Sequence, residues 1–69
     1  MKISARNVLK GIVNEIHEGA VNDEVVIEVP GGQEIVSVVT KSSVEKLGLA
    51  KGKPAYAVIK ASSVMLAVD

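Results

Sequence analysis

The sequence lacks several residue types on which small domains commonly depend. Its 69 residues include no cysteine, no tryptophan and no phenylalanine, and Tyr56 is the single aromatic residue. Without cysteine, neither a disulfide nor a thiolate-bound metal can stabilise the fold. A core of Val, Ile, Leu and Ala is marginal at this length, because small domains bury little of their surface. We therefore expect self-association to supply the missing stability.

A surplus of charge is also absent. Eight basic and eight acidic residues give a formal net charge of zero, whereas nucleic-acid-binding domains usually carry a basic surplus. Apolar runs such as 55–59 and 64–68 are far shorter than the roughly 20 residues that span a bilayer, and Lys2 is not followed by the apolar region of a signal peptide. These features predict one domain over residues 1–69, located in the cytoplasm, with no nucleic-acid or membrane partner.

Alternating and β-branched stretches predict an all-β first half. Residues 5–17, 21–29 and 33–40 read as three strands. Gly11 predicts a bulge or bend within the first strand. Pro30-Gly31-Gly32 predicts a hairpin turn between the second and third, because proline presets φ and glycine tolerates a positive φ.

The second half predicts one short helix followed by two strands. Ser42-Ser43-Val44-Glu45 fits a capping box with Ser42 as the N-cap, ahead of a helix over 43–47 that stops at Gly48. Residues 55–60 and 63–68 read as the fourth and fifth strands, separated by a kink at 61–62. Five strands with a helix between the third and fourth predict a five-stranded, OB-like Greek-key barrel.

Three polar stretches offer donors that suit a small anion. Ser4-Ala5-Arg6-Asn7 contains a hydroxyl, a carboxamide and the only arginine, whose planar guanidinium matches an oxyanion. Lys60-Ala61-Ser62-Ser63 again places a cation beside hydroxyls. Thr40 and Ser43 lie at the start of the predicted helix, where backbone N–H groups are unpaired. Two cations with neutral donors suit a tetrahedral dianion.

Each stretch also has a simpler interpretation. Arg6 and Lys60 could be solvated surface cations, and the serines could serve only as helix caps or turn residues. His17, the only histidine, is predicted to lie on the surface rather than act as a base. Asp23, Glu24 and Glu28 are predicted to form a solvated edge rather than a metal site. The sequence therefore predicts no catalytic residue and no ligand set for a metal cation.

The same stretches resemble the molbindin family, the small molybdate- and tungstate-binding proteins also called Mop domains. The resemblance spans essentially the whole chain. It implies an OB-like barrel that assembles as a hexamer, a trimer of dimers, with the oxyanion held at subunit interfaces for intracellular storage or buffering and without catalysis. It is carried by Ser4-Ala5-Arg6-Asn7 with Leu9 and Gly11, residues 43–49, Gly52, and residues 56–65.

The resemblance also implies the site residues. Arg6 and Lys60 would supply charge, and a neighbouring subunit would add two of the hydroxyls. The full set is Ser4, Ala5, Arg6, Asn7, Lys60, Ala61 and Ser62 from one subunit, with Thr40 and Ser43 from its neighbour.

Two positions depart from the family pattern. Pro30 stands in a hairpin where relatives often carry another residue. Lys41 replaces a frequent Leu or Ala, and it adds a charge beside Thr40 that predicts a modest change in anion affinity or selectivity.

Two other functions fit some of the same features. A regulatory barrel that binds nucleic acid would share the fold, although neutral charge and a lone tyrosine argue against it. A purely structural oligomer would pair Arg6 and Lys60 with acidic residues across subunits.

Overall fold

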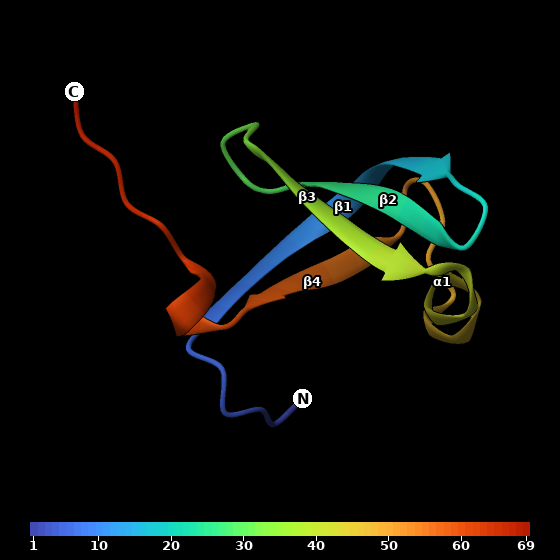
Figure 1. The fold of residues 1–69 in the computed structure, drawn as a ribbon, viewed down its shortest axis with the longest axis horizontal. Helices are drawn as coiled ribbons and strands as arrows, with labels where there is room; N and C mark the ends of the chain where they lie inside the picture. The colour runs from blue at the N-terminus through green and yellow to red at the C-terminus, as the bar shows by residue number, and fades with distance from the viewer.

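In the computed structural model, which describes residues 1–69, the chain folds into one antiparallel sheet and one short α-helix (Figure 1). The helix lies between the third and fourth strands, so the predicted all-β class and the predicted place of the helix are confirmed. Neither helical segment has the length and apolar character needed to cross a bilayer. The elements are β1 (Asn7–Glu18), β2 (Asn22–Glu28), β3 (Glu34–Thr40), α1 (Lys41–Leu47), β4 (Pro54–Ile59) and a 3₁₀ turn, η1 (Ala61–Ser63).

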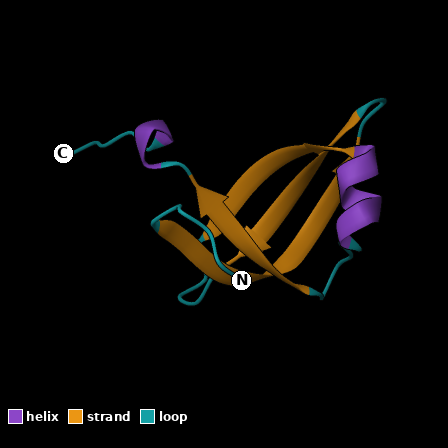
Figure 2. Ribbon diagram, turned by 90° about the horizontal axis from the view of Figure 1, so that it is seen from below, coloured by secondary structure: helices purple, strands orange, loops and turns teal.

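The strand order is β3-β2-β1-β4, and all neighbouring pairs are antiparallel. Three hairpin-connected strands with a fourth returning beside the first make a Greek key. The long central strand β1 pairs through its first half with β4 and through its second half with β2. Figure 2 shows the resulting curl of the sheet, with α1 at one end and η1 at the other.

Gly11 and the β1 irregularity are separate features. The register shift falls between Val13 and Glu15, so the bulge predicted at Gly11 lies a few residues further along. At Gly11 itself the strands approach closely. A Cβ there would sit 2.6 Å from Ile27 Cγ2 and closer still to the carbonyl oxygen of Glu28. Glycine is thus required for packing, since any side chain would displace β2.

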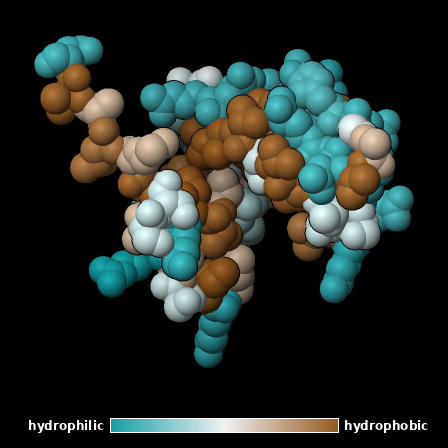
Figure 3. Space-filling model, viewed as in Figure 1, coloured by the Kyte–Doolittle hydropathy of each residue, from teal (hydrophilic) through white to brown (hydrophobic).

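The core is small. Seven of the 69 residues are buried, and Val13 and Val25 are the largest side chains that are almost fully enclosed. Much apolar surface remains open, as the brown areas of Figure 3 show. Val36, Val38 and Tyr56 are all at least half exposed. The expected shortage of buried apolar surface is confirmed. The core cluster is Val13, Val25, Ile27 and Ala57, packed against Ile16, Val29, Ile35, Val39, Val44, Leu49 and Ala55.

The predicted fifth strand is wrong for the isolated chain. Residues 64–69 have no strand pairing and extend away from the sheet as an arm, in red in Figure 1. Met65 and Leu66 are each 93% exposed. A β-prone segment becomes a strand only when it pairs, and no partner is available here. As a result β3 and β4 are both edges, and the barrel is not closed within one chain.

The helix begins earlier than predicted. Thr40, not Ser42, is the N-cap: its hydroxyl oxygen accepts the backbone N–H of Ser43 at 3.1 Å. Thr40 has the extended backbone of a final strand residue, so the strand end and the cap coincide, and Ser42 lies inside the helix. The predicted stop at Gly48 is confirmed, because this residue has a φ of 65° and its N–H bonds the carbonyl of Glu45.

Replacing Gly11 with alanine should lower the free energy of unfolding by about 1–3 kcal/mol, because the added methyl group overpacks against β2. Denaturant titration followed by circular dichroism measures this change. Glu45→Ala, on the exposed surface of α1, is the control and should change stability little. Equal midpoints for Gly11→Ala and the wild type would contradict the close approach of β1 and β2.

Candidate functional site

One hollow of about 450 Å³ gathers most of the predicted anion-binding residues. It lies at the end of the sheet where β1 begins and β4 ends, and Asn7 pairs with Ile59 across that junction. Because the two strands are antiparallel, the residues before β1 and those after β4 leave the sheet side by side. The lining residues are Ile3, Ser4, Ala5, Arg6, Val58, Lys60 and Ala61. Sequence analysis missed the apolar members Ile3 and Val58, which carry no polar signal.

Asn7 and Ser62 lie beside this hollow rather than on its lining. The Asn7 side-chain NH₂ donates to the Ile59 carbonyl at 3.3 Å, so it fastens β1 to β4. Ser62 is the middle residue of η1, in which Ser63 N–H bonds the Lys60 carbonyl. The first N–H groups of such a turn, those of Ala61 and Ser62, have no acceptor within it. They remain available as donors beside Lys60.

The hollow has uncompensated positive charge. The ion pairs of the chain join His17 to Glu15 and Lys41 to Glu18 and Asp23. Arg6 and Lys60 take part in none of them, and no carboxylate lines the hollow. An anion in this hollow would meet two cationic side chains and no carboxylate. The electrostatics therefore favour a bound anion.

Thr40 and Ser43 lie at the opposite end of the molecule. Thr40 ends β3 and pairs with Asn22, while the hollow lies beyond the start of β1 at Asn7. Figures 1 and 2 both show α1 and η1 at opposite ends of the sheet. One chain thus brings together the N-terminal and Lys60 parts of the predicted site but not the Thr40–Ser43 part.

The hydroxyls at the start of α1 form a short chain. The Thr40 O–H donates to Ser43 Oγ at 2.8 Å, and Ser42 Oγ is 3.1 Å from Thr40 Oγ1. Since the Thr40 proton is engaged, the hydroxyl of Ser43 keeps its own proton for an outside acceptor. The expected free N–H groups are largely absent, because Lys41 N–H bonds the Val21 carbonyl and Ser43 N–H bonds Thr40. Side-chain hydroxyls are the donors that this end of the molecule offers.

Asp23 differs most from its prediction. It was expected on a solvated edge, yet it is only 3% exposed. Its Oδ1 accepts the Lys41 ammonium at 3.0 Å and the Gly19 N–H at 3.3 Å. This contact raises the pKa of Lys41 above its ordinary value, with Glu18 adding to the effect. The alternation of side chains along β2 would have predicted this burial, because Asp23 lies on the same inward face of the strand as Val25 and Ile27.

His17 lies on the surface, as predicted. Its Nε2 is 2.9 Å from Glu15 Oε2, and both side chains are more than half exposed. The two residues form a solvated pair at the end of β1, far from the hollow. No group of three His, Asp or Glu side chains is placed to hold a metal ion.

Comparisons with known proteins agree on one family. The TOBE domain family model matches residues 3–66. A probable molybdenum-pterin-binding protein of Haemophilus influenzae is 52% identical over 69 residues, covering all of both chains. Molybdenum-pterin-binding protein 1 of Clostridium pasteurianum is 47% identical over 66 residues and covers 96% of this chain and 97% of its own length.

Solved structures agree in fold. MopII of Clostridium pasteurianum superposes with a TM-score of 0.92 at 45% identity, covering 97% of this chain and all of its own. The cytoplasmic molybdate-binding protein ModG, solved with molybdate bound, superposes with a TM-score of 0.96 at 54% identity. This chain is fully covered and spans 49% of ModG. The chain therefore belongs to the TOBE domain family, in its molbindin group of molybdenum-pterin-binding proteins.

Proposed function

We propose that this protein binds molybdate or tungstate, as a tetrahedral dianion, in sites shared between subunits of a homo-oligomer. The observation that carries the proposal is the hollow beside Arg6 and Lys60, two cations without a carboxylate partner in the chain. The relationship to ModG, which binds molybdate, supports the same ligand class.

The donor set matches such an anion in charge and in number. Arg6 and Lys60 balance two negative charges. The Ser4 hydroxyl and the N–H groups of Ala61 and Ser62 give neutral hydrogen bonds to the oxygens. Charge-assisted bonds from a guanidinium are short and directional, which favours a tetrahedral oxyanion over a spherical halide. The bound group is then a ligand held without chemistry, and we propose no catalytic activity.

A second subunit completes the site in this proposal. The residues that line the hollow would contact an anion on one side only, because the hollow is open to solvent. Thr40 and Ser43 lie too far away in the same chain to close it, and they present a free hydroxyl donor. We propose that these two residues of a neighbouring subunit supply the other wall of the site.

The C-terminal arm supports self-association. It carries Val64, Met65, Leu66 and Val68 into solvent without a partner. A hollow of about 290 Å³ separates the unpaired edges of β3 and β4, and it is lined mainly by apolar residues such as Ile35 and Val58. We propose that the arm of one copy adds to these edges of another and forms the fifth strand of an OB-like barrel. Three such dimers would then form the hexamer that the family resemblance implies.

Residues 1–69 form a single binding domain in this proposal. ModG is a cytoplasmic protein, and we extend that location to this chain. The proposed role is storage or buffering of the oxyanion. A nucleic-acid-binding role is less favoured, since a lone tyrosine gives no stacking platform. A purely structural oligomer would require acidic partners for Arg6 and Lys60 from another subunit.

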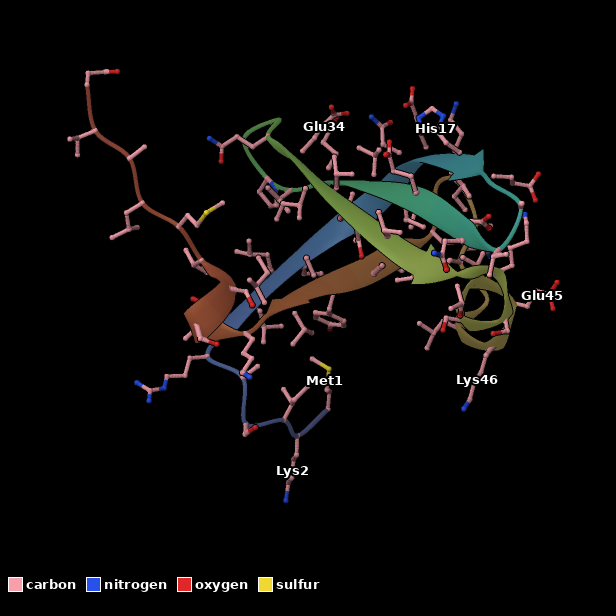
Figure 4. The ribbon with its side chains drawn as sticks, in the orientation of Figure 1. Met1, Lys2, His17, Glu34, Glu45 and Lys46 are labelled. Atoms are coloured by element: carbon pink, nitrogen blue, oxygen red, sulfur yellow. The ribbon has the colours of Figure 1, made fainter.

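Replacing Arg6 or Lys60 with alanine should weaken molybdate binding by about 2–5 kcal/mol if subunit contacts remove water from the charge pair, because the bound anion then loses a desolvated partner. Arg6→Lys should recover only part of this loss, since an ammonium lacks the planar fork. Isothermal titration with molybdate measures each affinity. Lys2→Ala is the matched control: it removes the same charge from the same terminal segment, and Figure 4 shows Lys2 pointing away from the sheet.

The outcomes separate the three functions. Wild-type affinity in Arg6→Ala would refute the assigned site, and no heat with the wild type would refute molybdate binding. A structural oligomer predicts a lower melting temperature for Arg6→Ala with no molybdate binding before or after. Binding of single-stranded DNA that is lost with added salt would favour the nucleic-acid role.

Replacing Leu66 with aspartate should reduce assembly, because a carboxylate replaces an apolar side chain where the arm enters an apolar hollow. Native mass spectrometry, with and without molybdate, gives the subunit count and the anion stoichiometry together. Asp69→Ala changes the same arm without removing apolar surface and should assemble normally. An unchanged oligomer in Leu66→Asp would contradict the role given to the arm.

A further inference from the structure

The ion pair of Lys41 and Asp23 lies directly behind the Thr40–Ser43 hydroxyls. Lys41 is the first residue of α1 and follows Thr40 in the chain. Its ammonium reaches Asp23 Oδ1 at 3.0 Å and Glu18 Oε1 at 3.3 Å, and its backbone N–H bonds the Val21 carbonyl at 3.0 Å. One residue thus ties the β3–α1 junction to the end of β1 and to the start of β2.

Asp23 makes this anchor strong. A carboxylate that is 3% exposed must be paired, because burying an unpaired charge costs several kcal/mol. Its two partners are the Lys41 ammonium and the Gly19 N–H. The same pair also removes Lys41 as a free cation, since two carboxylates surround one ammonium. Any effect of Lys41 on a bound anion should therefore act through position rather than through added charge.

α1 has few other anchors. It is seven residues long, and none of its residues is buried. Val44 is the helix residue that packs against the core cluster, and Lys46 points away from the sheet (Figure 4). The direction of the Ser43 hydroxyl then depends on the Thr40 cap, whose position is fixed by the pairing of Thr40 with Asn22 on one side and by Lys41 on the other.

We propose that Lys41 is a positioning residue for the oxyanion site. By anchoring the β3–α1 junction to Asp23, it orients the Thr40–Ser43 pair so that the Ser43 O–H points out of the subunit toward the anion. This inference rests on the proposed function, because it assigns a supporting residue to the wall that Thr40 and Ser43 contribute.

The test compares four proteins by isothermal titration with molybdate and by amide hydrogen exchange at Ser43. Lys41→Met keeps an unbranched side chain but removes the ammonium, and it should weaken binding about tenfold, as loss of a group that orients a ligand-binding side chain commonly does. Exchange of the Ser43 N–H, which is bonded to Thr40, should become faster. Lys41→Arg should restore both, and Lys46→Met on the same helix should change neither.

A double variant separates position from charge. Lys41→Met alone leaves the buried Asp23 carboxylate without its counter-ion, with only the Gly19 N–H as a partner, and that charge would itself repel an anion and destabilise the fold. Asp23→Asn combined with Lys41→Met removes that carboxylate, and a persistent tenfold loss supports positioning. Full recovery of affinity in the double variant would overturn the proposal in favour of a charge effect.

Two further outcomes are distinguishable. If the wild type binds molybdate and Lys41→Met binds equally well, this inference fails while the proposed function stands. If the wild type shows no binding, the proposed function fails. In that case an unchanged exchange rate at Ser43 in Lys41→Met would also refute the anchoring itself.

Discussion

The sheet has more edge than one chain can cover, and the other features of the molecule follow from that constraint. With aliphatic side chains to fill its interior, the chain buries seven residues and leaves the outer edges of β3 and β4 unpaired. Unpaired edges and open apolar hollows are unfavourable in water, and they direct a chain toward association. The exposed arm carries the apolar side chains that we propose to fill such a hollow in another copy. The fold and the proposed assembly thus have one physical cause.

The two ends of the sheet differ in how their basic side chains are paired. Lys41 lies between two carboxylates at one end of the sheet, whereas Arg6 and Lys60 at the other end have none. The ion pairs of Lys41 connect the start of α1 to β1 and β2, whereas Arg6 and Lys60 remain available to bind a ligand. This difference is how a chain with zero formal net charge would attract a small anion at the proposed site.

Much of the fold was predictable because its signals are local. Alternation, the Pro30-Gly31-Gly32 turn and Gly48 each act over a few residues, and the corresponding elements are confirmed. The failures involve contacts between distant segments. The predicted strand over 63–68 has strand character, but in this chain it has no partner to pair with. Thr40 rather than Ser42 caps α1, because β3 ends at Thr40. Asp23 is buried because Lys41 reaches it from another element. At the site, the resemblance implied the grouping of Ser4, Arg6 and Lys60, and the antiparallel pairing of β1 with β4 gives its physical reason. The resemblance also implied that Thr40 and Ser43 come from a neighbouring subunit, and their place at the opposite end of the sheet (Figure 1) agrees with that separation.

A split site has a thermodynamic consequence. If an anion touches residues of two subunits, it binds only the assembled form, so it stabilises the oligomer by RT ln(1 + [L]/Kd) for each site. At an anion concentration of about 100 times Kd this term is about 2.7 kcal/mol per site. That is comparable to the whole stability expected of a marginal small domain. With several sites in one assembly, the stability of the oligomer would then depend on the concentration of the oxyanion. A protein with a small core and open edges would couple storage of the anion to its own assembly.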